Sequence, residues 1–386
     1  VLHGAAAQMA LSPAEVKRRR SVADGLKLRV LNFSVQEILD DEHLEPTCRD
    51  LDCVELWSGV ASVHGAAVGI GAASVAFDRD RIVGVTDNKA SATTEDIACY
   101  NGFKHALGLV MRLRPGGLLW MAPVCSSFLF MNLVNTKRSR STVPAYMGAT
   151  SYQPVCDGNL MAKVACVLFI VAWARAVEAA IENPANSLMF LYGPVHQTFS
   201  QLSAHYTVCA RCVFDDNPYG QRPLKRYKFA ATGPWVKALA ARCRCPGHRH
   251  LPLVRTAVIN GKRKVTGIKG ALKQSQQYPR ALGRAIIKAW QQSLNCCADV
   301  QQPSPRSKAL VSRGTHIQKP KHLAKRRDWM TPAADSTVKA ARGSNGKQGP
   351  GLRKLQGTSS QHLVRPSLDT RSTVSSVRQW MQPACD

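Results

Sequence analysis

The sequence lacks acidic residues over a long segment. Residues 217–298 contain 17 Lys and Arg but no Asp or Glu, whereas residues 1–216 contain 19 basic and 20 acidic residues. The whole chain of 386 residues carries a formal net charge of +27. A neutral region followed by an acid-free basic segment is typical of a protein that binds a polyanion on one side. The alternative is a solvated basic surface that has no specific partner.

Long apolar runs are also missing. The longest, Val164–Ala174, has 11 residues and is bounded by Lys163 and Arg175. Because a membrane span requires about 20 apolar residues, we expect a buried helix there and no contact with a membrane. No secretory signal precedes the 13 cysteines. We therefore interpret them as thiols of an intracellular protein, for which the nucleus is one suitable compartment.

Aromatic residues make up only 6% of the chain. Those of the basic segment are too far apart to form a platform on which single-stranded bases stack; they are Tyr227, Phe229, Trp235, Tyr278 and Trp290. We expect salt-dependent contacts with phosphate groups instead. The basic residues that suit this role are Lys262, Arg263, Lys264, Lys269 and Lys273. Purely solubilising charge is the alternative.

The chain divides into three parts. Residues 1–48 form an N-terminal extension that we expect to be partly helical. Residues 49–295 alternate strand-like apolar runs with helical segments, which predicts an α/β domain with a mainly parallel sheet that ends in an antiparallel hairpin. A short basic insert occupies residues 231–276 of this domain. Residues 296–386 are rich in polar and basic residues and are predicted to be disordered.

Cys125 follows an apolar run that ends at a proline. Leu118–Ala122 is predicted to be a buried strand, and Pro123 cannot extend it. Cys125 therefore lies in the loop that leaves the sheet at its carboxyl edge, where open α/β folds place ligands. A thiol at this edge is a candidate nucleophile, and a buried cysteine that packs as a small hydrophobic residue is the alternative. A later apolar run ends in the same way at Glu182.

A glycine turn and an acidic residue mark a candidate nucleoside site. Cys53–Trp57 is predicted to be the first strand, and Ser58 and Gly59 form the turn that follows it. The second predicted strand ends at Asp78, which could accept hydrogen bonds from the hydroxyls of a ribose. Since the G-x-G-x-x-G pattern is absent, an ordinary strand–helix turn is the alternative.

Four potential zinc ligands lie close together in the basic insert. They are Cys243, Cys245, His248 and His250, with Cys209 and Cys212 upstream. Thiolates and imidazoles suit tetrahedral zinc, and a small insert gains folding free energy from a metal. A basic loop with polar Cys and His side chains is the alternative.

In their order, these segments resemble the catalytic domain of the DNA cytosine-5 methyltransferases. Glu55–Gly59 is similar to the D-L-F-x-G loop, Asp78-Arg-Asp80 to E-x-D, Glu95-Asp96-Ile97 to G-D-I, Pro123-Val-Cys125 to P-P-C, Glu182-Asn183-Pro184 to E-N-V, and residues 219–226 to the Y-G-x-x-Q-x-R-x-R hairpin. Gln276–Pro279 and the following helix resemble the segment that closes the domain.

The resemblance implies a Rossmann-like sheet that binds S-adenosylmethionine. Trp57 would pack on the adenine beside Ser58 and Gly59, Asp78 would hold the ribose, and Asp96 would meet the adenine amino group. The target would be cytosine in DNA, with RNA as the less favoured alternative, bound through residues 217–298.

The resemblance also implies a catalytic group. The thiolate of Cys125 would add to carbon 6 of cytosine, because carbon 5 by itself is a poor nucleophile. Glu182 would contact N3 of the base and relieve the charge that develops on the ring. A cation such as Arg226 would lower the pKa of the thiol and orient the base.

A second function stays open. Val124 stands where the family has proline, Ala61 stands where it has glycine, and the basic insert is short. These departures favour a degenerate relative that binds nucleic acid without transferring a methyl group. Amino methylation of adenine is less favoured because the Cys125 loop has neither the acid nor the aromatic residue of a D-P-P-Y motif. We expect a monomer, although no pattern determines the oligomeric state.

Overall fold

The computed structural model describes residues 11–31, 33–41, 48–79, 81–83, 96–210, 212, 224–244, 250, 252–268 and 275–300, and every structural statement here concerns these ranges. The segment predicted to be disordered, residues 296–386, begins inside a helix, α10 (Arg280–Val300), so the prediction is wrong for residues 296–300, and the rest of the segment lies outside the described residues.

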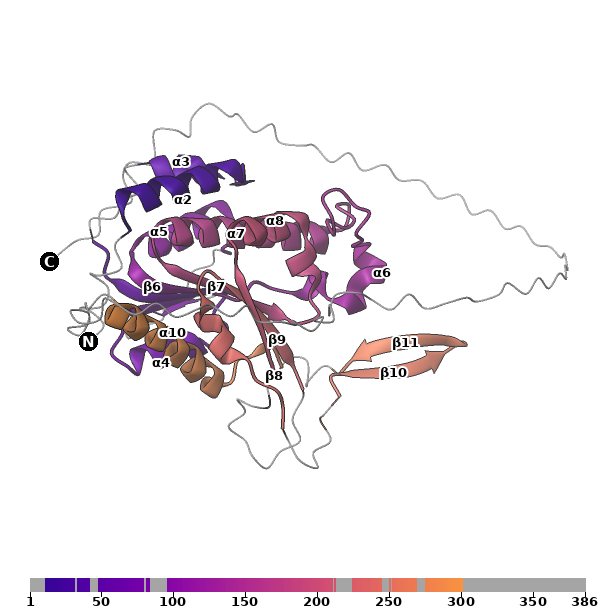
Figure 1. Cartoon of the computed structure of the whole chain (residues 1–386). Coiled ribbons are helices and arrows are strands. Elements are labelled where there is room, and N and C mark those ends of the chain that lie inside the picture. The colour runs from indigo at the N-terminus through magenta and orange to yellow at the C-terminus, as the bar shows by residue number, and fades with distance from the viewer. Residues whose placement is uncertain are drawn as a thin grey trace, which may run out of the picture. The chain divides into compact units, whose positions relative to one another are not determined.

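A seven-stranded mixed sheet forms the centre of the described fold, in the order β5-β4-β3-β6-β7-β9-β8 (Figure 1). Its strands are β3 (Leu51–Leu56), β4 (Ser74–Asp78), β5 (Arg81–Val83), β6 (Leu113–Met121), β7 (Glu178–Pro184), β8 (His205–Ala210) and β9 (Arg226–Ala231). Strands β4, β3, β6 and β7 are mutually parallel, while β9 is antiparallel to both β7 and β8, and β5 is antiparallel to β4. The prediction of an α/β fold whose largely parallel sheet ends in an antiparallel hairpin is confirmed.

Helices cover both faces of this sheet (Figure 1). One face carries α5 (Tyr100–Met111), α7 (Gln153–Ala174) and α8 (Gly193–Gln201), over which α2 (Pro13–Gly25) and α3 (Val35–Asp40) form an outer layer. The other face carries α4 (Ser62–Val68), the 3-10 helix η6 (Pro234–Leu239) and α10 (Arg280–Val300). Because both faces are covered, every residue of the central strand β3 is buried, including its two acidic residues, Asp52 and Glu55.

The predicted buried helix at residues 164–174 is the second half of α7. This helix is long and apolar enough to cross a membrane, with a mean hydropathy of 1.8 over its best window, but 78% of that window is buried inside the fold. It packs against β6, β7, α5 and α8. The core position accounts for its apolar composition, as it does for the central helix of other α/β domains.

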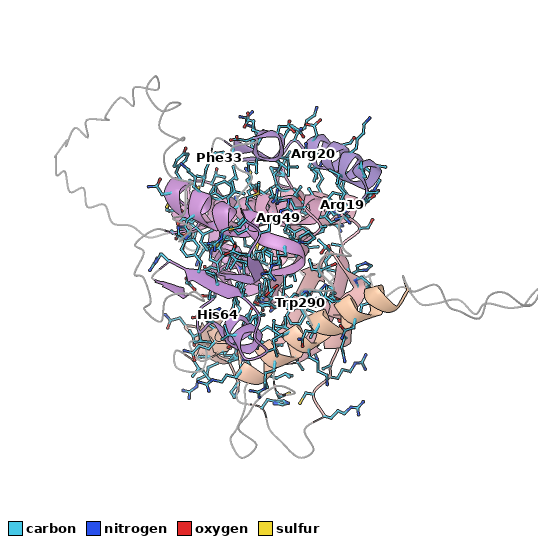
Figure 2. All side chains as sticks on the ribbon, turned by 90° about the vertical axis from the view of Figure 1, so that its left-hand side faces the viewer. Arg19, Arg20, Phe33, Arg49, His64 and Trp290 are labelled. Atoms are coloured by element: carbon cyan, nitrogen blue, oxygen red, sulfur yellow. The ribbon has the colours of Figure 1, made fainter. Side chains whose placement is uncertain are left out.

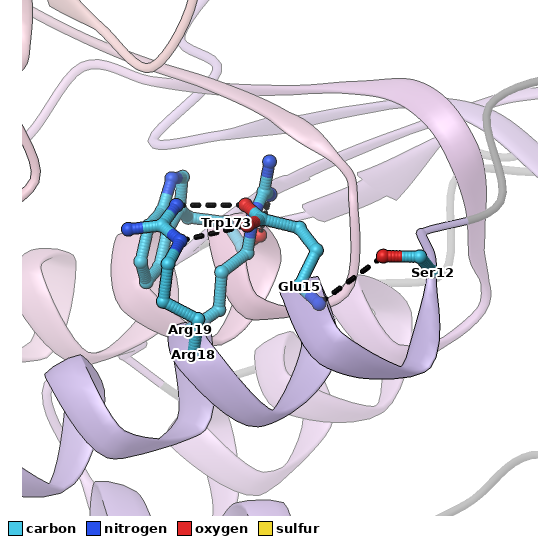
Figure 3. A network of polar contacts seen from close by, with 5 residues as sticks. All are labelled: Ser12, Glu15, Arg18, Arg19 and Trp173. Atoms are coloured by element: carbon cyan, nitrogen blue, oxygen red, sulfur yellow. Dashed lines mark hydrogen bonds and ion pairs between the residues drawn. The ribbon is translucent and has the colours of Figure 1, made fainter.

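Helix α2 is attached to the end of α7 through an arginine–tryptophan contact (Figure 3). The hydroxyl of Ser12 caps α2 by accepting a hydrogen bond from the backbone N–H of Glu15 at 3.2 Å. The Glu15 carboxylate pairs with both Arg18 and Arg19, at 2.7 and 2.8 Å. The guanidinium of Arg19 lies over the Trp173 ring, 4.9 Å from its centroid, and also donates to the Trp173 carbonyl. The contact between the Trp173 ring and the Arg19 guanidinium orients α2 on α7.

Helix α10 packs very closely on α4. A Cβ atom at Gly283 would lie 2.1 Å from the carbonyl oxygen of Ser62, so only glycine fits this position. Further along α10, the indole N–H of Trp290 donates to the carbonyl of Gly116 at 2.9 Å. Figure 2 shows Trp290 on the same side of the sheet as His64 of α4. This packing determines where the residues immediately before α10 lie.

Two further antiparallel strand pairs lie outside the seven-stranded sheet. The first joins β1 (Arg29–Val30) to β2 (Phe33–Ser34), and the second joins β10 (Val254–Ile259) to β11 (Lys262–Gly267). The turn of the second pair is Asn260-Gly261, with φ values of 52° and 70°. An Asn-Gly pair with two positive φ values is the preferred two-residue turn of a β-hairpin. The hairpin occupies much of the predicted basic insert.

Candidate functional site

The candidate site lies where β6 and β7 end side by side. These strands are parallel, with Met121 opposite Ile181, so the residues that follow leave the sheet at the same edge. The side-chain amide of Asn183 donates a hydrogen bond to the carbonyl of Pro123 at 3.0 Å. Asn183 is fully buried. This bond holds the loop that carries Cys125 against the end of β7.

Cys125 is half-buried at the start of a 3-10 turn, Ser126–Phe128. Its carbonyl accepts a hydrogen bond from the N–H of Phe128 at 2.9 Å. Burial raises the pKa of the Cys125 thiol to about 11; the charge of Lys225 opposes this shift, and that of Glu182 adds to it. Both charged groups therefore act on the thiol, and Cys125 is a protonated thiol near neutral pH in this conformation.

Glu182 is a buried carboxyl group with one unsatisfied oxygen. The phenol of Tyr278 donates to its Oε2 at 2.5 Å, while Oε1 has no hydrogen-bond partner in the described part of the chain. Burial raises the pKa of Glu182, against the opposing effects of Lys225 and of the Tyr278 hydrogen bond. A raised pKa favours the protonated carboxyl, which can donate a hydrogen bond to a ligand.

Tyr278 links this carboxyl to the first helix of the domain. Its backbone carbonyl accepts a hydrogen bond from the hydroxyl of Ser62 at 3.0 Å, at the start of α4. Its ring packs edge-on against that of Tyr227, with centroids 5.8 Å apart. Sequence reasoning placed Tyr278 in the closing segment but missed its bond to Glu182, since no local pattern reports a partner 96 positions away.

The cation that acts on the site is Lys225 rather than Arg226. On β9, Phe229 stands opposite Glu182, and cross-strand partners point to the same face of a sheet. Because side chains alternate along a strand, Lys225 shares this face with Tyr227 and Phe229, whereas Arg226 faces the other way and is exposed. In the sequence, Lys225, Tyr227 and Phe229 occupy alternate positions. This pattern could have indicated that Lys225 lies on the same face of the strand as the two aromatic rings.

Lys225 is held in place by two contacts. Its ammonium donates a hydrogen bond to the carbonyl of Ser275 at 3.0 Å and lies 4.5 Å from the centroid of the Tyr227 ring. Residues 213–223, which include most of the segment similar to the Y-G-x-x-Q-x-R-x-R hairpin, lie outside the described residues.

Trp57, Ser58, Gly59 and Asp78, four of the five predicted cofactor residues, lie together at the turn after β3. The backbone N–H of Gly59 donates to Oδ2 of Asp78 at 2.6 Å, and that of Arg79 donates to Oδ1 at 2.7 Å. Trp57 and Ser58 are buried, and neither the indole N–H nor the hydroxyl has a hydrogen-bond partner within the described ranges. The turn thus presents two buried polar groups beside a carboxylate at the edge of the sheet.

The backbone of this turn is strained. Trp57, Gly59 and Ala61 have φ values of 54°, 53° and 54°, in the left-handed region. A residue with a Cβ atom adopts this conformation at a cost of about 1–2 kcal/mol. Ala61, which stands where the resembling family has glycine, therefore occupies a position that favours glycine.

Asp96 lies in a separate loop before α5. Its Oδ1 accepts a hydrogen bond from the N–H of Ala98 at 2.9 Å. Helix α5 runs beside β4, since the rings of His105 and Phe77 lie 5.1 Å apart. Asp80 and Glu95, the other acids of the two similar segments, lie outside the described residues.

The predicted zinc ligands are described only in part. Cys243 and His250 come together with Cys212, with all three ligand atoms within 4.8 Å of one another. Cys245 and His248 lie outside the described residues. Cys209 is buried in the sheet, where it pairs with Tyr227.

Comparison with models of known protein families finds no match, and comparison with curated protein sequences finds none either.

Proposed function

We propose that this protein transfers a methyl group from S-adenosylmethionine to carbon 5 of cytosine in DNA, with Cys125 as the nucleophile. The observation that carries the proposal is that Cys125 and Glu182 lie at the ends of the neighbouring parallel strands β6 and β7, where Asn183 donates a hydrogen bond to the carbonyl of Pro123. A largely parallel sheet that ends in an antiparallel hairpin supports it, because the resemblance to cytosine-5 methyltransferases implies such a Rossmann-like sheet.

The turn after β3 has the groups that a nucleoside requires. The indole N–H of Trp57 and the hydroxyl of Ser58 are buried polar groups without described partners, which a ligand would satisfy. Each oxygen of Asp78 accepts one backbone hydrogen bond and keeps a lone pair for a ribose hydroxyl. S-adenosylmethionine, when bound there, would supply an electrophilic methyl group.

Each of the three residues at the edge of the sheet would have one role in methyl transfer. The thiolate of Cys125 adds to carbon 6 of cytosine, which makes carbon 5 nucleophilic. Protonated Glu182 donates from its unsatisfied oxygen to N3 and reduces the charge on the ring. Lys225 stabilises the thiolate. Carbon 5 would take the methyl group of bound S-adenosylmethionine, whose sulfur–methyl bond breaks to leave S-adenosylhomocysteine. Loss of the carbon 5 proton to water and expulsion of the thiolate would then restore the aromatic ring. The target base must leave the stack of a duplex to reach these groups.

The basic segment would hold the nucleic acid. It includes β9, the hairpin β10–β11 and α10 and contains no acidic residue up to position 298. Lysine and arginine side chains on this segment would contact phosphates, so binding would weaken steeply with salt concentration. Localisation in the nucleus and action as a monomer belong to the same proposal.

The alternative function is nucleic-acid binding without methyl transfer. Two observations favour it: burial raises the pKa of Cys125 to about 11, which opposes thiolate formation, and Ala61 strains the turn that would hold the cofactor. Covalent trapping separates the two functions. With S-adenosylmethionine and DNA that contains 5-fluorocytosine, methyl transfer stops at a covalent Cys125–DNA complex that survives denaturation.

Cys125→Ser is the matched control, since it should bind the same DNA and form no complex. The methyl-transfer proposal fails if the wild-type protein binds this DNA and S-adenosylmethionine yet gives no covalent complex. DNA binding without complex formation would then establish the alternative.

A further inference from the structure

Three potential metal ligands from distant parts of the chain converge beyond the end of β8. They are the thiols of Cys212 and Cys243 and the imidazole of His250. Every pair of their ligand atoms lies within 4.8 Å. Cys212 is buried and the other two are half-buried, so the group is partly shielded from water. This group contains none of Cys125, Glu182 and Lys225, and the inference does not depend on the proposed function.

The pairing of β8 with a later segment brings the two thiols together. Cys209 forms a parallel bridge with Ala241, and the N–H of Ala210 donates to the carbonyl of Ala241 at 3.1 Å. Cys212 follows the bridged Cys209 by three positions and Cys243 follows Ala241 by two, and their two sulfur atoms lie within 4.8 Å of each other. Sequence separation alone does not predict this register.

The spacing of the group fits tetrahedral zinc. Zinc binds sulfur at about 2.3 Å and imidazole nitrogen at about 2.0–2.1 Å, which at a tetrahedral angle separates the two ligand atoms by about 3.6 Å. The distance between Cys243 Sγ and His250 Nε2 is 3.5 Å. Soft sulfur and imidazole ligands are those that zinc prefers over harder cations such as magnesium.

We propose that Cys212, Cys243 and His250 bind a structural zinc ion. These residues supply three of the four ligands of such a site. The ion would tie the end of the edge strand β8 to the segment that leads into the hairpin β10–β11. It would therefore determine how the root of this basic hairpin is attached to the sheet. Compared with the set predicted from the sequence, the structure adds Cys212 as a ligand.

Zinc analysis of the full-length protein tests this site. Protein purified without chelators should contain about one zinc per chain, and Cys212→Ser and His250→Ala should each lose most of it. Cys48→Ser is the control, because Cys48 is an exposed thiol far from the group in sequence. Wild-type protein without zinc, or Cys212→Ser protein with wild-type zinc content, would overturn the proposal.

A second measurement, made on the wild-type protein, tests the site even if the variants fail to fold. X-ray absorption at the zinc edge of wild-type protein should show at least two sulfur neighbours and one imidazole. A shell of oxygen and nitrogen only would overturn the proposal. So would a Cys212–Cys243 disulfide in the unreduced protein, detected by mass spectrometry, since oxidised sulfurs do not bind zinc as thiolates.

Discussion

The phenol of Tyr278 donates a hydrogen bond to Oε2 of Glu182 at 2.5 Å, although 96 positions separate the two residues. The bond satisfies one oxygen of a buried carboxyl and leaves Oε1 without a described partner. A buried carboxyl with a raised pKa and one oxygen without a described partner is costly to maintain, and such groups concentrate at functional sites. Tyr278 therefore both holds Glu182 in place and determines which of its oxygens stays without a described partner.

Replacement of this carboxyl should reduce catalysis strongly. We expect Glu182→Gln to slow methyl transfer by about two to four orders of magnitude, the usual contribution of one positioned acid. Glu178→Gln is the control on the same strand; Glu178 accepts bonds from Thr232 and Trp235, at 2.8 and 3.0 Å, at the other end of β7. Single-turnover rates with saturating DNA would measure both. Wild-type turnover in Glu182→Gln would contradict the assigned role.

Loss of the Tyr278 phenol should shift the pH profile. The bond from Tyr278 lowers the pKa of Glu182, so its removal in Tyr278→Phe raises that pKa further. If protonated Glu182 is the active form, activity falls as pH rises through its pKa. The alkaline limb of the pH–activity profile should therefore lie at higher pH in Tyr278→Phe than in the wild type.

Tyr152→Phe, which alters an exposed tyrosine, should keep the wild-type profile. A shift of the alkaline limb to lower pH in Tyr278→Phe would contradict this assignment of the acid.

The reactivity of Cys125 should depend on Lys225 and not on Arg226. Burial raises the pKa of the thiol to about 11 and Lys225 opposes the shift, so the pKa should rise further in Lys225→Met. Alkylation of Cys125 by iodoacetamide, followed by mass spectrometry from pH 7 to 10, should be slower in Lys225→Met at every pH. Arg226→Met is the matched control. A larger effect of Arg226→Met would return the role to the residue predicted from the sequence.

The turn after β3 should bind the cofactor. We expect Trp57→Ala and Asp78→Asn to weaken the binding of S-adenosylmethionine by about 1–3 kcal/mol each, for a lost stacking surface and a lost charge-assisted hydrogen bond. Titration calorimetry would measure the change. Asp157→Asn, at an exposed position of α7, should bind as the wild type does. Equal affinities of all three variants and the wild type would rule out this turn as the site.

A glycine at position 61 should stabilise the protein. Ala61 has a φ of 54°, a conformation that costs a residue with Cβ about 1–2 kcal/mol. Glycine adopts it freely but loses about 0.5–1 kcal/mol through the larger entropy of its unfolded chain. Ala61→Gly should therefore raise the free energy of unfolding by about 0.5–1 kcal/mol in urea titrations.

Ala66→Gly, inside α4, is the control of opposite sign and should lower the free energy of unfolding by about 0.5–1 kcal/mol. Destabilisation by Ala61→Gly would show that the turn is not strained at this position.

The sequence by itself determined the sheet and the ends of its strands. The apolar runs that predict strands near residues 53, 118 and 178 correspond to β3, β6 and β7, because a strand buried on both faces is mostly apolar. Pro123 terminates one run, and a carboxylate ends another at Glu182. Local chain chemistry was sufficient for these features.

Only the tertiary structure decided which side chains meet at that edge. Lys225 rather than Arg226 acts on Cys125 because the pairing of β9 with β7 selects one face of the strand. Tyr278 reaches Glu182 because Gly283 allows α10 to pack on the backbone of Ser62. Cys212 meets Cys243 through a bridge between an edge strand and a later segment. Each of these contacts joins residues far apart in sequence, and their proximity depends on strand register and helix packing, which no local pattern encodes.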